Sequence, residues 1–248
     1  MKVTYLTPIK KISDYVQSIL VIENYQLTNI FQLPLFANGT PTLLFHTSKG
    51  EIKNNSNYLT LFGQTVLPEK LFLKNDFVLI AYFLKPWSLA SLFGVSAKEL
   101  TDNPVDFNLL SKNNNLQEKL LNAKTTNQML SLLDDFIFSK ISKNNASERL
   151  VKYASEKIID NPHKNILVEI QNELCITERT FQRIFEKSIG ISPNHFRKIN
   201  QFNQAFQQLN TKQYKSLSEV AFGQWFIQTK AITFVYLKSL LTSLLKNI

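Results

Sequence analysis

The stretch that decides the fold of the second half of the chain runs from Ile166 to Phe185 and reads ILVEIQNELCITERTFQRIF. Apolar residues recur at helical spacing up to Leu174, and the same spacing resumes after the break at Cys175 and Ile176. The pattern predicts a short helix that ends near Leu174 and a second helix that begins at Thr177, whose hydroxyl can cap it. A turn this short is typical of two helices packed at a steep angle, which presents the second helix to a DNA major groove.

The second helix should bury one face and expose the other. Its apolar residues Phe181, Ile184 and Phe185 should turn into a core. The exposed face then carries Arg179, Thr180, Gln182 and Arg183. Arginine can bind guanine at two acceptors, and glutamine can bind adenine through its donor and acceptor together, so these residues are candidate base readers. The alternative is that they form only the solvated face of an amphipathic helix.

Helical patterns also flank this segment. Polar residues Ser142 to Asn145 mark a boundary, and Ser147 can cap a new helix, which Asn161-Pro162 would end. Its inner face, and that of a later helix, are expected to carry Leu150, Ala154, Ile158, Ile199, Phe202, Phe206 and Leu209. The last two fifths of the chain therefore read as a compact all-helical domain.

The first third has a different period. Short apolar runs, separated by turn signals, predict the strands of a small antiparallel β-barrel or sandwich. The expected strands are Gln17 to Glu23, Thr42 to His46, Tyr58 to Phe62, Leu71 to Leu73 and Phe77 to Leu84. The expected turns are Asn38-Gly39, Lys49-Gly50, Lys53 to Asn57 and Asn75-Asp76.

From Trp87 onward the pattern becomes helical. Leu89, Leu92 and Phe93 predict a short helix, and two further helices are expected over Leu116 to Leu121 and Thr126 to Ile141. The fold class is therefore α+β. We expect a β-rich domain over 1–110, a helical connector over 111–145 and a helical domain over 146–248.

Charge and cysteine content narrow the partners and the compartment. The formal net charge of the 248 residues is +9, and residues from Ser147 onward hold 14 basic against 8 acidic side chains, which suits a polyanionic partner there. The single cysteine, Cys175, excludes an internal disulfide and fits a reducing cytoplasm. The longest apolar run, Phe77 to Leu84, is too short for a membrane helix, and no secretion signal is visible, so no membrane partner is expected.

Enzymatic and metal chemistry are not expected. His46 is the only histidine of the barrel region, and a lone histidine is more often structural than a ligand. The sequence shows neither a histidine cluster nor a paired carboxylate site nor a Gly-rich phosphate loop. We therefore predict no metal, no cofactor and no catalytic residue, which a metal assay on the purified protein would check.

The run from Ile176 to Phe185, followed by Gly190-Ile191-Ser192-Pro193, resembles the first helix-turn-helix of AraC-family transcription regulators. The likeness extends from Arg149 to Phe222, through a linker helix at about Asn194 to Leu209 and a second start at Leu217 to Phe222. The resemblance implies a bacterial regulator that binds double-stranded DNA, with Arg179, Gln182 and Arg183 facing the bases. Gln171 and Cys175 depart from the family's usual alanine and glycine, which predicts looser packing at the crossing of the helices.

The first half resembles the cupin-like sensory domain attached to one branch of these regulators. The likeness is carried by Tyr15 to Glu23, Phe83 to Pro86, Leu92-Phe93-Gly94 and Glu99 to Asp102. It implies a domain that senses a small-molecule effector or mediates formation of a homodimer.

The tail after Phe222 departs from the family. Trp225 stands where a glycine is expected, and Ala231 to Leu245 is largely apolar where a polar recognition helix should follow. Reading Gln228 to Ile248 one nucleotide earlier through plausible codons allows Ser-Asp-Gln-Ser-His-Tyr-Ile-Arg-Leu-Phe-Lys-Glu-Phe-Thr-Asp-Val-Ser-Pro-Lys-Lys-Tyr, which looks like the family's second recognition helix. Our hypothesis is a frameshift near Gly223; the alternative is a genuine divergent end. An unbroken frame at the locus from Val220 onward, with no overlapping family-like frame, would reject the hypothesis.

Three functions remain open. The main one is a sequence-specific DNA-binding regulator. A second is a regulator that is impaired in DNA binding and acts only through protein interactions. Loss of the second helix-turn-helix would leave a single unit to contact DNA. A non-metal cupin-type enzyme is the third.

Overall fold

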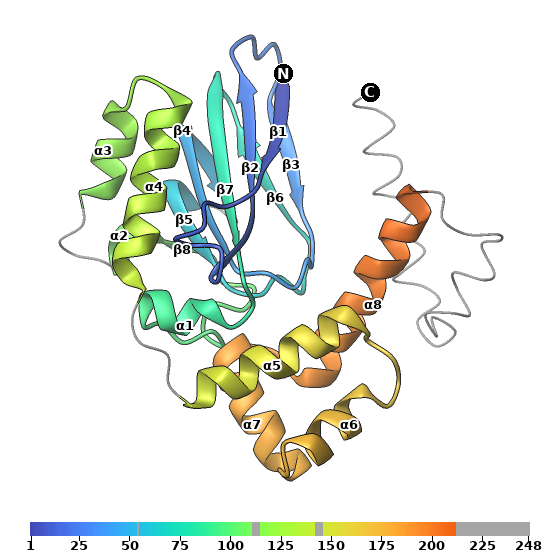
Figure 1. Cartoon of the computed structure of the whole chain (residues 1–248). Coiled ribbons are helices and arrows are strands. Elements are labelled where there is room, and N and C mark those ends of the chain that lie inside the picture. Colours follow the sequence, from blue (N-terminus) through green and yellow to red (C-terminus); the bar gives the residue numbers. More distant parts are fainter. Residues whose placement is uncertain (54, 111–114, 142–145, 212–248) are drawn as a thin grey trace.

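The structure is a computed structural model, and it describes residues 1–53, 55–110, 115–141 and 146–211. Figure 1 shows a β-rich unit with helices on one side and a group of helices beneath it. The predicted linker helix is present as the last described helix. The second helix-turn-helix and the tail after Phe222 lie outside the described residues.

The described residues of the first unit form an eight-stranded antiparallel sheet. Its order is β1-β2-β7-β4-β5-β8, and a β6-β3 pair continues from the far end of β4. The strands are β1 (Lys2–Leu6), β2 (Val16–Asn24), β3 (Phe31–Leu35), β4 (Thr42–Ile52), β5 (Asn55–Phe62), β6 (Glu69–Leu73), β7 (Phe77–Leu84) and β8 (Val105–Asp106). The antiparallel sheet and each of the five expected strands are confirmed.

Two expected turns are corrected. Lys49-Gly50 lies inside β4, where the pairing with β5 shifts register between Phe45 and Gly50, so the glycine marks an irregularity within a strand. In the Asn-rich segment, Lys53 has a positive φ of 48°, but β5 already begins at Asn55, so Asn55 to Asn57 lie in a strand and not in a turn. Asn38-Gly39 does turn, with Gly39 at a φ of 76°.

The sheet is covered on both faces. One face packs against α4 (Thr126–Lys140) and α3 (Leu116–Asn122), as Figure 1 shows, and Tyr82 of β7 donates a hydrogen bond to Asp134 of α4 at 2.7 Å. Apolar side chains of β3 and β6 cover the other face. Two short helices, α1 (Ser88–Phe93) and α2 (Phe107–Leu110), complete this unit. The expected helices after Trp87 are thus confirmed, and α3 and α4 share the core of the sheet.

The second unit is helical, as expected. It contains α5 (Ala146–Asp160), α6 (Ile166–Glu173), α7 (Glu178–Ile189) and α8 (Pro193–Asn210). The predicted inner-face residues of α5 contribute Ala154 and Ile158 to a shared core with α6, α7 and α8. Ser147 was expected to precede the first helix, but α5 begins one residue earlier, at Ala146, so Ser147 lies within it.

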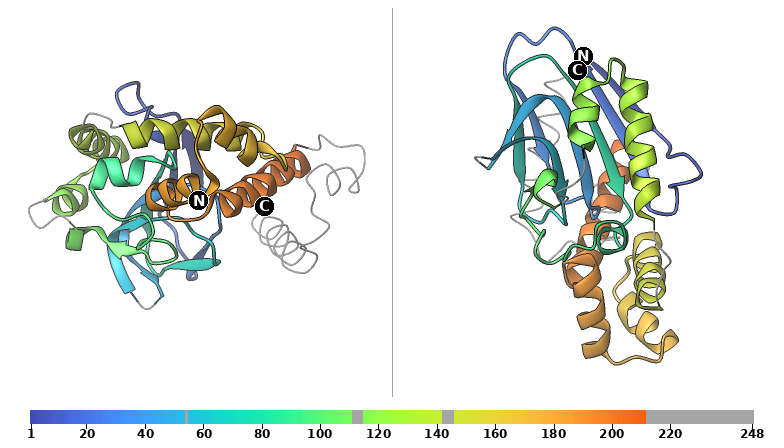
Figure 2. Two further views of the ribbon diagram at one scale, coloured as in Figure 1. Left: turned by 90° about the horizontal axis from the view of Figure 1, so that it is seen from below. Right: turned by 90° about the vertical axis from the view of Figure 1, so that its left-hand side faces the viewer.

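The two units touch along a shared boundary. Trp87, at the start of α1, is buried among the core residues of the helical unit. The amide of Asn203 on α8 donates a hydrogen bond to the carbonyl of Asn38 at 3.1 Å. Figure 2 shows α6 and α7 projecting from the end of the molecule farthest from the sheet. The boundary therefore holds the base of the helical unit and leaves its far end open.

The one histidine of the barrel region gives a pH-dependent prediction. His46 is fully buried, with its Nδ1 at 2.7 Å from the Ser48 carbonyl, and burial lowers its pKa to about 4. Because the unfolded chain binds this proton with a pKa of about 6.5, the unfolded state holds more protons between those values. Stability should therefore fall as the pH drops from about 6.5 to 4, by up to roughly 3 kcal/mol from this group. Urea unfolding of His46→Gln should show a shallower loss over that window; equal slopes in both proteins would contradict the assignment.

Candidate nucleic-acid interface

The turn between α6 and α7 is built as the sequence predicts. Helix α6 ends at Glu173, and Cys175 adopts a left-handed φ of 51° that reverses the chain. The Ile176 amide then donates a hydrogen bond to the Gln171 carbonyl at 3.1 Å, which closes the turn. Only four residues thus separate the two helices, and Figure 1 shows them meeting at the exposed end of the unit.

Thr177 caps the second helix. Its backbone is extended, and its hydroxyl accepts a hydrogen bond from the Thr180 amide at 3.3 Å. At the other end of α7, Gly190 has a left-handed φ of 97° and ends the helix. These two signals fix the length of the helix to Glu178–Ile189.

The buried face of α7 matches the prediction. Phe181 and Phe185 are fully buried, and their rings meet edge to face with centroids 5.6 Å apart. Phe185 also lies 5.5 Å from the ring of Phe196 on α8. Ile184 is half-buried and packs against the same core.

The opposite face exposes three of the four candidate base readers. Arg179, Gln182 and Arg183 are exposed and lie on the free side of α7. Thr180 differs, because it is half-buried and its hydroxyl lies 3.0 Å from the Thr177 hydroxyl. Its hydroxyl therefore takes part in the cap of the helix and is less accessible to a base than the three exposed side chains.

Sequence reasoning missed one neighbour on this face. The Gln182 amide nitrogen donates a hydrogen bond to the Glu178 carboxylate at 3.0 Å, one turn earlier on α7. The contact fixes which way the amide points and leaves its carbonyl and one N–H available. The i, i+4 spacing of the two residues was the signal that could have predicted it.

The left-handed cysteine supplies a stability prediction. The left-handed conformation destabilises a residue with a Cβ by about 1–2 kcal/mol. Glycine avoids this strain, but the greater entropy of its unfolded chain offsets about 0.5–1 kcal/mol of the stabilisation. Cys175→Gly should therefore raise the free energy of unfolding by about 0.5–1 kcal/mol, measured by urea denaturation. Cys175→Ala is the matched control and should change little. A destabilised glycine variant would contradict the strain assigned to this turn.

Within residues 1–53, 55–110, 115–141 and 146–211, no three His, Cys, Asp or Glu side chains gather as metal ligands would. His46 is instead held against the Ser48 carbonyl. In the same ranges, no helix combines the length and apolar character needed to cross a bilayer.

Comparison with known proteins adds a partial family match. Residues 4–106 match the model of a domain of unknown function, DUF6597. The match covers the sheet through β8 and stops before α2. A comparison with curated proteins gave no match.

Solved structures of ToxT from Vibrio cholerae are similar to the chain. One at 1.65 Å resolution is 9% identical, with a TM-score of 0.42. The alignment covers 90% of this chain and 89% of the ToxT chain. A structure with bound unsaturated fatty acid is 12% identical, with a TM-score of 0.42 and coverages of 85% and 87%. A third, bound to (E)-4-(8-methylnaphthalen-1-yl)but-3-enoic acid, is 8% identical, with a TM-score of 0.41 and coverages of 90%. At such low sequence identities and TM-scores, the similarity gives no evidence of function.

Proposed function

We propose that the chain is a sequence-specific DNA-binding transcription regulator of the AraC type, which enters a major groove with α7. The observation that carries the proposal is the arrangement of α7: a capped helix at the exposed end of its unit, with Arg179, Gln182 and Arg183 on its free face. The resemblance from Arg149 to Phe222 supports the same conclusion.

The mechanism follows from general rules of DNA recognition. Basic side chains of the second unit neutralise phosphates and fix the position of the protein, with an affinity that falls as salt rises. The N-terminal half of a recognition helix contacts base edges, and Arg179, Gln182 and Arg183 all lie in the first half of α7. The Glu178 contact restricts the Gln182 amide, which suits two hydrogen bonds to adenine.

The domain boundaries belong to the same proposal. We place a cupin-like sensor or dimerisation domain at 1–110, a helical connector at 111–145, whose described helices α3 and α4 pack on the sheet of that domain, and the DNA-binding domain at 146–248. The chain would act in the cytoplasm of a bacterium, without a catalytic step, metal or cofactor.

Arg183→Ala tests the reading face. It should remove about 1–3 kcal/mol of discrimination at one base pair of the bound site, while the melting temperature stays unchanged. Titrations on the bound site and on its single base-pair variants measure this loss. Equal weakening on every sequence would show that Arg183 contacts phosphate instead of a base.

The first unit would supply regulation, either by binding a small-molecule effector or by forming a homodimer. An open cleft of about 470 Å³ offers a place for an effector, with apolar Pro34, Pro68 and Phe72 beside two lysines and two glutamates, Lys53, Lys70, Glu51 and Glu69. A thermal-shift screen of small organic molecules tests the effector, since a shift lost in Phe72→Ala would place its binding site in this cleft. Sedimentation tests the dimer. No shift and a monomer throughout would remove both roles from the first unit.

The tail decides how strongly the chain binds. Two helix-turn-helix units on one linker helix can combine their binding energies, so loss of the second should weaken binding and leave one half-site contact. We propose that a frameshift near Gly223 has caused this loss, and that a chain with the frame restored binds better and self-associates less. A shift assay on the upstream region of its own gene compares the two. Equal affinity and equal solubility would make the frameshift functionally irrelevant.

The second candidate is a regulator that no longer reads DNA and acts through protein contacts alone. The departure of the tail after Phe222 favours it. It would be supported if both the given and the restored chain failed to bind duplex DNA above the non-specific level.

A further inference from the structure

The segment between α1 and β8 lies between the two units of the molecule. Its residues Ala97 and Leu100 are buried, and its backbone touches a glycine on each side. On the sheet side, a Cβ at Gly63 would stand 2.7 Å from the Leu100 carbonyl carbon and oxygen. On the helical side, a Cβ at Gly190 would stand 2.6 Å from the Ala97 carbonyl oxygen. Both approaches are possible only without a side chain, so the segment is wedged backbone to backbone between the units.

A hydrogen bond joins the segment to the end of α7. The Thr101 hydroxyl lies 3.2 Å from the Gly190 carbonyl and 3.2 Å from the Ala97 carbonyl. Gly190 is the residue that ends the DNA-facing helix in a left-handed conformation. Thr101 thus holds the C-terminal end of α7, opposite to the end that carries Arg179.

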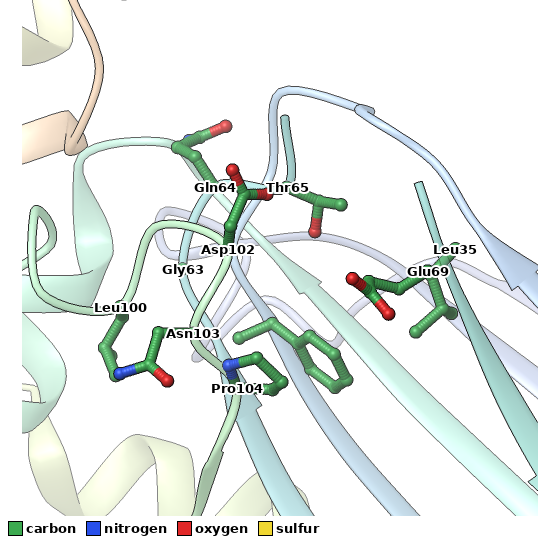
Figure 3. Close-up of a pocket in the computed structure, with 10 residues that line it drawn as sticks. Leu35, Gly63, Gln64, Thr65, Glu69, Leu100, Asp102, Asn103 and Pro104 are labelled. Carbon is green, nitrogen blue, oxygen red and sulfur yellow. The ribbon is translucent and has the colours of Figure 1, made fainter. Parts of the chain in front are cut away.

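The next residue fastens the same segment to the sheet unit. Asp102 has a left-handed φ of 53°, and its carboxylate accepts hydrogen bonds from the Val66 and Leu67 amides at 2.7 and 2.9 Å. Its own amide donates to the Gln64 carbonyl at 3.0 Å, and the Lys53 ammonium donates to its carbonyl at 2.7 Å. Figure 3 shows Asp102 directed at the loop after β5 that holds Gln64 and Thr65. A strained residue held by four hydrogen bonds is a firm anchor.

We propose that Ala97–Asp102 is a positioning element for DNA reading, because it fixes the end of α7 to the sheet unit. Thr101 is hydrogen-bonded to the end of α7, and Asp102 is hydrogen-bonded to the sheet unit. A shift of the loop around Gln64 or of Lys53 then moves α7, because Asp102 is hydrogen-bonded to both and Thr101 is hydrogen-bonded to the end of α7. The mechanical part depends only on the contacts above, and its consequence for DNA rests on the proposed function.

Amide hydrogen exchange of the full chain tests the mechanical part. Thr101→Val keeps the branched shape and removes the hydroxyl, so the amides of the last turn of α7 should exchange roughly fivefold faster, as for the loss of one hydrogen bond. Thr47→Val is the matched control. It removes a half-buried hydroxyl that accepts a hydrogen bond from the Val78 amide within the sheet unit, so amide exchange in α7 should not change.

Gly63→Ala separates positioning from a local structural role, because Gly63 contacts the segment only from the sheet side. It should also accelerate exchange at the end of α7. If it fails to fold, Asp102→Ala replaces it, since it releases the Val66 and Leu67 amides on the same side. Faster exchange confined to the sheet unit in these variants, or unchanged exchange in Thr101→Val, would overturn the proposal.

Binding to duplex DNA then tests the consequence. Thr101→Val should reduce the preference for the best site over its single-mismatch variants by roughly the same fivefold, with an unchanged salt dependence, because no phosphate contact is lost. Faster exchange without any DNA binding by the parent chain would leave the positioning element standing and refute the proposed function. Faster exchange with an unchanged preference would refute the link between them.

Discussion

Phe185→Ala should lower the free energy of unfolding of the helical unit by about 3–5 kcal/mol. The ring is fully buried and contacts both Phe181 of its own helix and Phe196 of α8. Its removal leaves a cavity in a small core where α7 and α8 meet, and this core cannot refill the space without moving a helix. Urea unfolding followed by circular dichroism measures the loss.

Phe138→Ala provides the control for that experiment. Phe138 is 48% exposed on α4, in the other unit, so truncation of the same side chain should change stability by less than about 1 kcal/mol. An unchanged unfolding transition in Phe185→Ala would mean that the buried face assigned to α7 is wrong. The exposed face assigned to base reading would then be wrong as well.

Trp87→Ala should have an effect of similar size, about 3–5 kcal/mol, for a different reason. Trp87 follows β7 in the sheet unit, yet its ring is 3% exposed and packs in the core of the helical unit, with the Lys152 ammonium of α5 at 5.6 Å from its centroid. Its loss should therefore weaken the helical unit and separate the unfolding of the two units. Calorimetry should show two transitions for this variant and a single transition for the parent chain.

Trp87→Phe distinguishes packing from a general effect of mutation at this site. It keeps an aromatic ring in the core and should retain a single transition with a smaller loss of stability. A single, unshifted transition in Trp87→Ala would contradict the shared core between the units.

Among the elements that the sequence predicted, the clearest have a long apolar run or an evident capping residue. Strand β7 is an unbroken apolar run, and α7 combines a Thr177 cap with aromatic residues on one face. Strand β3 was missed because Pro34 in its interior argues against a strand. Lys49-Gly50 was taken for a turn because glycine marks a bulge within a strand as readily as a reversal between strands.

The exposed face of α7 could be predicted because a helix determines its own faces. Arg179 and Arg183 are four residues apart, so they must share a side that is opposite to Phe181 and Phe185. Contacts between the units could not be predicted. Thr101 and Gly190 meet across 89 residues, and neither residue type signals a partner on its own. Trp87 gave no sign that it would leave its own unit to pack in another core.

The proposed reading of DNA by α7 can be tested by selection of binding sites from a random pool of duplexes. The parent chain should enrich one short motif, and Arg183→Ala should lose the preference at one position of that motif while keeping the others. A pool without any enriched motif, or a motif that is unchanged when Arg179, Gln182 and Arg183 are each replaced by alanine, would contradict the claim.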